Sequence, residues 1–487
     1  MPTLTPPAPL NDTEREFYGP KVVAVEPGGV EFIPLSERHG SPIQLLWTWT
    51  SPNMEFATVA VGLLGVLYFG LTFWQTVLAI VIGTLAGSVS QGILSTWGPK
   101  DGLCQMVLSR TGFGFLGNIL PSGLNAIIAG VGWFAVNSIS GALALHVLIN
   151  GLPKQFCLLL IVLLELGIAF FGHNLVHLFE RFAFPVLTVI FVVASIWVLT
   201  KAHPGAPAGP TSSSLGGFLI MLGASFGYAA GWNSYASDYT RYLKPETPKL
   251  TIALFAGLGV FVSCVLLEVA GAAVVTALSP GGLNAALGSG PDPGEMTGLL
   301  PGWLGKLTLI AIFIGAICAN VLNIYSAGLS ALAVGLKLPT TSARAAVSIV
   351  LGVIGYVVAI FYINDSSKYE NFLLIIAYWI GPWLAVVFLD RWFRRGATDT
   401  AALAQDRNHT NWAGPISMAI GAGVSIWLFA NQPPRLIGVI PTSHPAFGDL
   451  TFEVGFVLSA VLYVVLRPIL KRKTSVGVTS DEERISA

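Results

Sequence analysis

Paired aromatic and amide side chains stand inside strongly apolar stretches of this chain. Trp133 and Asn137 are four residues apart, and Asn320 and Asn323 are three apart, so each pair falls on one face of a helix. Indole rings offer flat faces for stacking, and amides offer donors and acceptors together. These groups suit a planar heterocycle with a mixed hydrogen-bonding edge, such as a nucleobase. For each pair alone, aromatic packing plus amide bonds between helices is the other interpretation.

A third polar group lies in the stretch GASFGYAAGWNSYASDYTRY, residues 223–242. It contains Phe226 and Trp232 among closely spaced glycines, which weaken helix continuity and permit close packing. No Lys or Arg stands in the middle of the apolar segments, so a strongly anionic ligand would find no counter-charge. The residues therefore predict a neutral, planar, hydrogen-bonding ligand.

The stretch LLWTWTSPNMEFATVAVG, Leu45–Gly62, is apolar at both ends and polar in the middle. Pro52 removes a backbone donor and disfavours helical geometry at Ser51. Asn53 and Glu55 place further polar groups beside this break. Broken helix survives in a membrane only where it is buried in protein or lines a cavity. The stretch is interpreted as a discontinuous helix facing a binding site, and a Pro-kinked structural helix is the alternative.

The chain has 487 residues, of which 54% are hydrophobic and 10% are charged. A soluble domain carries about 25% charged residues, so this composition predicts a protein that crosses the membrane many times. We expect a cytoplasmic N-terminal segment over 1–42, a transmembrane domain over 43–467 and a cytoplasmic tail over 468–487. The twelve apolar segments are 43–68, 71–95, 114–148, 154–173, 182–200, 214–238, 250–279, 303–336, 345–363, 369–389, 412–430 and 450–467.

The basic residues set the expected orientation. With the N-terminus inside, 20 of the 25 Lys and Arg residues fall on the cytoplasmic side. This excess follows the positive-inside rule and predicts that both termini are cytoplasmic, in the cell (plasma or inner) membrane. The formal net charge is zero, which gives no reason to expect a nucleic-acid partner.

Interrupted apolar segments open the chain and recur five segments later, at 214–238. This recurrence is typical of inverted repeats with a mid-membrane site between broken helices. The predicted fold is an all-α membrane protein with 12 transmembrane helices. Helices 1–5 and 6–10 would form the repeats, helices 1 and 6 would be broken, and helices 11 and 12 would be appended. Alternating access, rather than a passive channel, is expected from this repetition.

The chain resembles the nucleobase–cation symporter family, in its purine–cytosine permease branch. The resemblance rests on WTSPNM (Trp49–Met54), GWFAVN (Gly132–Asn137), GWNSYASDYTRY (Gly231–Tyr242) and NVLNIYSAGL (Asn320–Leu329). It implies the five-plus-five inverted-repeat fold of the amino acid–polyamine–cation type. It also places substrate-site positions at Ser51, Trp133, Asn137, Trp232 and Asn323, with Asn320 beside them. With Asn53 and Phe226 added from the residues themselves, the predicted substrate set has eight members.

The function expected from this resemblance is import of purine and pyrimidine nucleobases, in the cytosine, adenine, guanine and hypoxanthine class. Leu322 stands where fungal-type members have Pro, and Gly130 stands where bacterial cytosine permeases have Gln. These departures leave the preferred base open, and hydantoin, allantoin or another cyclic ureide is the alternative cargo. No nucleophile–base pair appears at membrane depth, so we expect no enzymatic activity.

A proton is the expected coupling cation, with sodium as the alternative. In sodium-coupled relatives, carbonyls of helix 1 and two hydroxyls of helix 8 hold the ion, and the resemblance places Cys318 and Ala319 at those hydroxyl positions. Neither supplies the oxygen ligands that a hard cation prefers. Carboxyls at membrane depth are functional hypotheses by default. Glu55 is the first proton-coupling candidate, followed by Glu268 and Glu165. The alternative for Glu55 is a carboxyl held permanently by hydroxyl neighbours.

No resident metal or cofactor is expected. The four cysteines are scattered and show neither a disulfide framework nor a metal-binding spacing. His173 and His177 stand four apart near Glu180, at the predicted cytoplasmic end of the segment 154–173. Because no third ligand pattern accompanies them, a solvated or interfacial helix end is preferred to a metal site.

Overall fold

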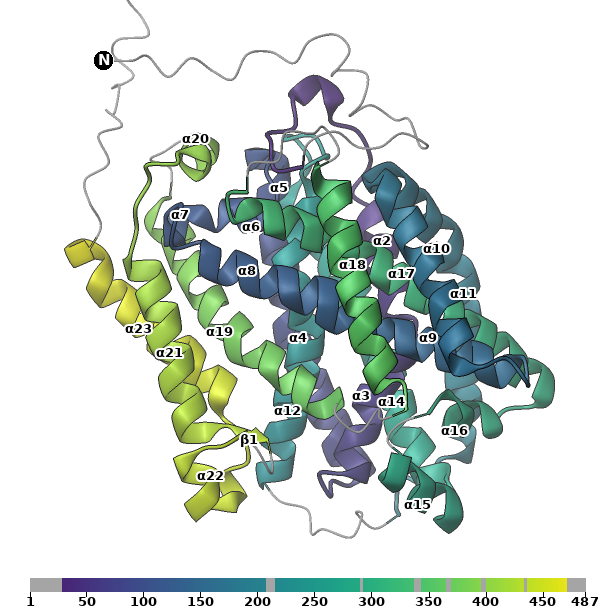
Figure 1. Ribbon diagram of the computed structural model, residues 1–487. Coiled ribbons are helices and arrows are strands. Elements are labelled where there is room, and N and C mark those ends of the chain that lie inside the picture. Colours follow the sequence, from purple (N-terminus) through teal and green to yellow (C-terminus); the bar gives the residue numbers. More distant parts are fainter. Residues whose placement is uncertain are drawn as a thin grey trace, which may run out of the picture.

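The computed structural model describes residues 29–206, 215–289, 292–336, 343–364, 369–395, 400–432 and 436–470. Helices dominate this part of the chain (Figure 1). Within it, ten helices are long and apolar enough to cross a membrane, and two shorter apolar helices accompany them. The predicted terminal segments, 1–42 and 468–487, lie largely outside the described residues. The prediction of a helical protein with many membrane spans is confirmed.

The elements follow the predicted apolar segments closely. In chain order they are η1 Leu35–Glu37, α2 Gln44–Thr50, η2 Ser51–Asn53, α3 Phe56–Leu67, α4 Phe73–Ser95, α5 Trp97–Asp101, α6 Gln105–Leu108, α7 Arg110–Phe113, α8 Ile119–Ile127, η3 Ile128–Trp133, α9 Phe134–Leu148, α10 Lys154–Phe171, α11 His173–Lys201, α12 Leu215–Ala230, η4 Gly231–Tyr235, α13 Ala236–Thr240, α14 Lys249–Ala277, α15 Pro280–Ser289, α16 Pro293–Gly298, α17 Gly302–Ala333, α18 Ala343–Tyr362, α19 Tyr369–Phe393, α20 Thr400–Gln405, α21 Ala413–Phe429, β1 Asn431–Gln432, β2 Leu436–Ile437, α22 Val439–Ser443, η5 Pro445–Phe447 and α23 Thr451–Leu470. The two short strands pair antiparallel.

The boundary between α10 and α11 differs from the prediction. Gly172 has φ of 96°, a left-handed conformation that favours glycine and ends α10. The next helix therefore begins at His173, nine residues before the predicted segment. The placement of His173 and His177 at the end of the preceding helix was wrong, because both belong to the first turns of α11.

Three of the spanning segments are irregular in the middle. The first breaks at η2, and the sixth changes from α-helix to the 3₁₀ turn η4. The third contains a π-helical stretch, η3, that the sequence analysis did not predict. Single π-helical turns are frequent at functional sites because they shift the helix face presented to neighbours.

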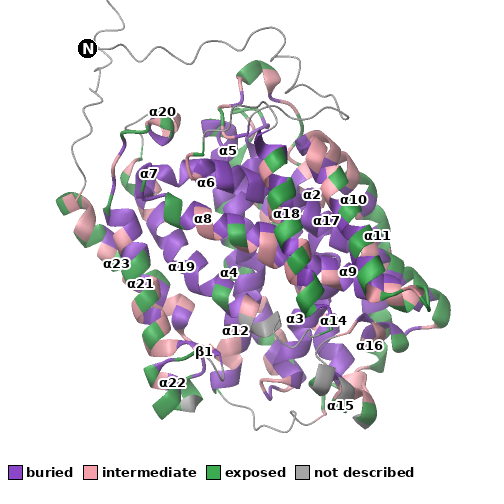
Figure 2. Cartoon of the chain, in the orientation of Figure 1, coloured by how far each residue is buried: buried purple, intermediate pink, exposed green. Residues whose placement is uncertain are grey.

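Close helix contacts fix the centre of the bundle. A Cβ at Gly62 would lie 1.7 Å from the carbonyl oxygen of Glu268, and one at Gly271 would lie 2.0 Å from that of Val59. Only glycine permits this approach of α3 to α14. Figure 2 shows buried residues concentrated in the middle helices. In α17, 78% of the most apolar 18-residue stretch is buried, whereas in α23 only 17% of the corresponding stretch is buried. The helix α17 is therefore central and α23 is peripheral.

Candidate substrate site

The break in the first helix is stabilised by its own side chains. Pro52 has no backbone N–H to continue the helical pattern. The Ser51 hydroxyl donates to the carbonyl of Trp47 at 2.9 Å, and the Asn53 amide donates to the carbonyl of Trp49 at 2.7 Å. Side-chain donors thus satisfy carbonyls at a break that hydrocarbon could not solvate.

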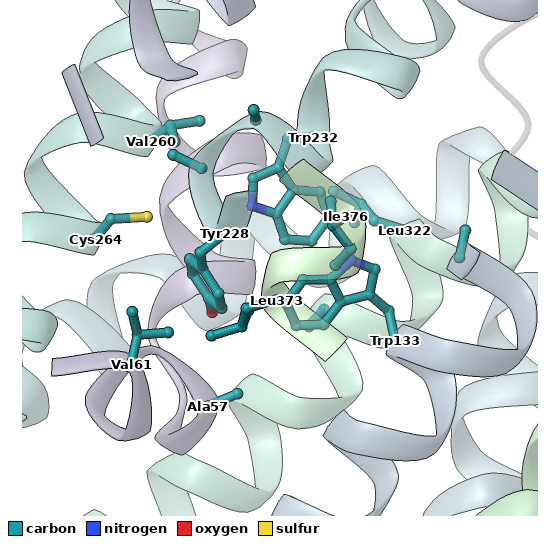
Figure 3. Packing of buried hydrophobic residues seen from close by; sticks show 14 of the residues in the cluster. Ala57, Val61, Trp133, Tyr228, Trp232, Val260, Cys264, Leu322, Leu373 and Ile376 are labelled. Atoms are coloured by element: carbon teal, nitrogen blue, oxygen red, sulfur yellow. The ribbon is translucent and has the colours of Figure 1, made fainter. Parts of the chain in front are cut away.

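A small cavity of about 10 Å³ lies between this break, η3–α9, η4 and α17. Four of the predicted substrate residues line it: Trp133, Asn137, Trp232 and Asn323. Figure 3 shows the rings of Trp133, Trp232 and Tyr228 gathered in one place. The complete lining is Pro52, Trp133, Asn137, Tyr228, Gly231, Trp232, Tyr235, Ala319 and Asn323.

Neighbouring groups hold the two indole rings in place. Trp133 meets Tyr228 and Phe372 edge-on, with ring centroids 5.4 and 5.1 Å apart. The Trp232 Nε1–H donates to Asn53 Oδ1 at 2.9 Å. Asn53 therefore orients Trp232 from outside the cavity. Fixed aromatic rings provide stacking surfaces with little ordering cost when a planar ligand binds.

The amide side chains form one connected network. Asn137 and Asn323 both donate to Asn320 Oδ1, at 3.1 and 3.3 Å. The Asn320 amide donates in turn to Ser138 Oγ and Glu165 Oε1, each at 2.9 Å. Asn137 and Asn323 line the cavity, whereas Asn320 lies behind them and holds them in position.

Four predicted residues do not line the cavity: Ser51, Asn53, Phe226 and Asn320. The first two belong to the helix break, and Asn320 anchors the amide network. Phe226 is not brought together with the others. Its ring stacks on Phe452 with centroids 4.3 Å apart and faces a separate groove between α4, α19 and α23.

Comparison with known proteins decides the family. Residues 32–455 match the family model described as permease for cytosine/purines, uracil, thiamine, allantoin. The chain belongs to this permease family. It is 31% identical to the purine-cytosine permease fcyB of Emericella nidulans over 91% of this chain and 88% of that one. It is 29% identical to the putative purine-cytosine permease YxlA of Bacillus subtilis, over 92% and 97% of the two chains.

Solved structures agree on the fold. The permease superposes on Mhp1, a nucleobase-cation-symport-1 family transporter in a closed conformation with bromovinylhydantoin bound, with a TM-score of 0.71. That match covers 90% of this chain and 94% of the other, at 18% identity. The permease therefore has the Mhp1 transporter fold.

The predicted coupling carboxyls are all engaged by hydrogen bonds. Glu55 accepts the backbone N–H of Ala57 and the hydroxyl of Ser140, each at 2.8 Å, and so caps the N-terminus of α3. Glu268 accepts the hydroxyl of Ser225 at 2.8 Å. Glu165 accepts from the amide network. For Glu55, this geometry matches the alternative interpretation of a carboxyl held by hydroxyl and backbone donors.

Glu180 is a buried carboxyl that the sequence analysis did not place in the site. It lies on α11 with no exposed surface, and among the described residues it has no ion pair. Its neighbours are Ser51 at the helix break and Cys318 on α17. The sequence analysis expected a solvated or interfacial helix end for His173 and His177, and the solvated alternative is wrong for His173, which is 7% exposed. The misplaced helix boundary concealed this position.

Two tyrosines of the cavity were also missed. Tyr228 lines it and shares a hydrogen bond with Thr58 on α3, and Tyr235 donates its hydroxyl to Asn323 Oδ1 at 3.3 Å. A sequence signal for them existed. Tyr228, Trp232 and Tyr235 are spaced four and three residues apart, which places them on one helical face.

Proposed function

We propose that this permease imports nucleobases of the cytosine, adenine, guanine and hypoxanthine class by symport with a proton. The observation that carries the proposal is the cavity in which two indole rings and two amides meet between broken helices. Ring faces favour a flat conjugated ligand, and Asn137 with Asn323 offer donors and acceptors for its edge. No Lys or Arg lines the cavity, which favours a neutral cargo.

A cyclic ureide such as allantoin or hydantoin is the second candidate. The family description includes allantoin, and the Mhp1 structure of the same fold holds a hydantoin. Both cargo classes are planar and carry N–H donors beside carbonyl acceptors. A nucleobase offers the larger conjugated face, which the two indoles match better. Competition between the two classes distinguishes them.

For coupling, we propose that Glu180 carries the proton. A buried carboxylate needs a balancing positive charge, and among the described residues Glu180 has no ion pair, with the Ser51 hydroxyl and the Cys318 thiol as its polar neighbours. Its position beside Ser51 and Cys318 connects it to the helix break and to α17, both of which border the cavity. Cys318 and Ala319 supply no oxygen for a sodium ion, which favours a proton.

A second cavity lies beside the segment of α11 that carries Glu180, although Glu180 does not line it. This cavity, of about 250 Å³, is lined by Thr48, His173 and His177 among others. His177 lies three residues before Glu180, on the same face of α11. Its ring Nδ1 is 3.3 Å from the Thr48 hydroxyl. Imidazole and hydroxyl groups transfer protons readily. We propose that protons reach Glu180 from this side.

The proposal includes twelve membrane-crossing segments, with helices 1–5 and 6–10 as inverted repeats and both termini in the cytoplasm. The two irregular segments, η2 and η4, border the same cavity, as expected where repeats meet. Rocking of one part of the bundle about this cavity would give alternating access.

The test is uptake of labelled cytosine and adenine into proteoliposomes under imposed ion gradients. An inward proton gradient should drive accumulation in sodium-free buffer, and unlabelled purines should compete better than allantoin or hydantoin. Preferred uptake of allantoin or hydantoin would replace the nucleobase assignment, and accumulation that requires sodium and ignores a protonophore would replace the proton.

Matched variants locate the coupling group. Glu180→Gln should abolish gradient-driven accumulation while leaving base binding and exchange measurable. Accumulation that survives in Glu180→Gln but is lost in Glu55→Gln would return the coupling role to Glu55.

A further inference from the structure

Two cavities outside the substrate site meet along the outer surface of the bundle. One is a pocket of about 480 Å³ between α4–α5 and the end of α19, and the other is a groove of about 390 Å³ between α4, α19 and α23. Ile93 and Phe388 line both of them, so the two form one continuous surface. Nothing in the proposed transport mechanism uses this surface.

The pocket is strongly basic and partly aromatic. Its lining includes Lys100, Lys249, Arg391, Arg394 and Arg395, together with Trp97 and Trp392. Within the described residues, carboxylates pair with two of these cations: Arg391 with Asp101 and Arg394 with Asp390, each at 2.7 Å. Counted over the described residues, Lys100, Lys249 and Arg395 therefore give the pocket an excess of three positive charges.

The groove has the opposite character. Apart from Ser90 and Glu453, its walls are apolar, and Leu384, Phe452 and Val457 are among them. The α4 wall continues through α5 into the pocket as one stripe at helical spacing, formed by Ala86, Val89 and Ile93 of α4 and Trp97 and Lys100 of α5. From Ala86 to Lys100, a rise of about 1.5 Å per residue gives about 21 Å, close to the depth of one leaflet with its headgroup layer.

We propose that this surface binds an anionic glycerophospholipid, with the phosphate in the basic pocket and an acyl chain in the groove. Basic pockets between helices at the cytoplasmic side of a membrane bind anionic headgroups. The positive-inside rule explains the sign of the charge on this face, but it does not require the cations to surround a cavity that opens into an apolar groove. Charge and shape together favour the lipid over a soluble phosphate, which would leave the groove unused.

The experiment uses the full-length permease in nanodiscs of phosphatidylcholine, with or without phosphatidylglycerol, and native mass spectrometry after detergent extraction. Phosphatidylglycerol should be retained in preference to phosphatidylcholine. Each removed charge near the membrane surface weakens such binding by about 1 kcal/mol, or about fivefold. Lys100→Gln with Arg395→Gln should therefore reduce retention by about 25-fold. The matched control, Lys244→Gln with Arg407→Gln, removes two exposed charges outside the pocket and should retain the lipid.

Filling the groove tests the acyl-chain half of the proposal. Ala86→Trp should reduce retention with all pocket charges present, whereas Val461→Trp, at an exposed position of α23 outside the groove, should not. Thermal unfolding of each variant verifies that the protein is folded. Equal retention by wild type and the charge variant would overturn the proposal. Glycerol 3-phosphate that raises the thermal unfolding temperature as much as phosphatidylglycerol does would show a soluble-phosphate site and overturn the lipid assignment.

Discussion

Replacing Asn320 with alanine should destabilise the permease much more than replacing Asn323, although both belong to the same amide network. The Asn320 side chain accepts hydrogen bonds from Asn137 and Asn323 and donates to Ser138 and Glu165. Its removal leaves the two amide groups and one Glu165 oxygen without these partners. Buried polar groups of this kind cost about 1 kcal/mol each in membrane proteins. Three such groups give a loss of about 2–4 kcal/mol in the free energy of unfolding.

Asn323→Ala should weaken ligand binding more than it lowers stability, the reverse of Asn320→Ala. It removes one 3.3 Å bond to Asn320 and one from Tyr235, and it opens space at the cavity wall. We expect about 1 kcal/mol of lost stability. In the proposed site Asn323 contacts the base, so its removal leaves a polar group of the base without a hydrogen-bond partner. This loss should weaken binding by about 1–3 kcal/mol, or roughly 5- to 150-fold.

The protein offers a direct assay for this contrast. Its four cysteines are free and buried, so a thiol-reactive dye reports thermal unfolding. Equilibrium binding of a labelled base, measured below the unfolding transition, gives the affinity. Asn125→Ala is a matched control, because this buried asparagine makes one interhelical bond to Ser330 and lies outside the cavity. Asn320→Ala protein with wild-type stability, or Asn323→Ala protein with wild-type affinity, would refute the division of roles.

Three further predictions concern separate features. Trp133→Ala and Trp232→Ala should each weaken base binding by about 1–3 kcal/mol, as for stacked bases elsewhere, whereas lipid-exposed Trp427→Ala should not change a binding titration. Glu55→Ala should lower the unfolding temperature by removing the cap of α3, a loss of about 1 kcal/mol. Burial raises the pKa of Glu295, in α16, to about 7, so the folded state binds more protons than the unfolded state between about pH 4.5 and 7. Stability should therefore fall as the pH rises through this range, and Glu295→Gln should flatten the decrease in an unfolding-temperature profile.

Much of the architecture was predictable because its causes are local. Apolar segment length marked the spanning helices, and Pro52 marked the break in the first. The spacing of Trp133 with Asn137 placed both on the face that lines the cavity. In each case, one short stretch of sequence contains the residues that produce the feature.

The remaining errors arise where a feature depends on contacts between distant segments. Phe226 has the same aromatic character as Trp232, yet its ring faces a different cavity, and only the packing of Phe452 against it shows which one. The π-helical turn before Trp133 has no simple sequence signature. Asn320 appeared equivalent to Asn323, and only the positions of Ser138 and Glu165 show that it lies behind the cavity wall.

The carboxyls show how packing, rather than residue type, separates a structural group from a candidate coupling group. Glu55 and Glu180 are both fully buried acids near the broken first helix. Glu55 receives two donors and ends its helix in a defined geometry, so its oxygens are already satisfied. Glu180 caps no helix and has no ion pair among the described residues, and its polar neighbours are the Ser51 hydroxyl on a broken element and the Cys318 thiol. A buried carboxylate without a balancing charge favours the proton-bound transporter over the proton-free one. Coupling requires such a free-energy difference between the two states. Sequence shows where both acids are, but only the packing shows that Glu55 caps a helix and that Glu180 is buried without a balancing charge among the described residues.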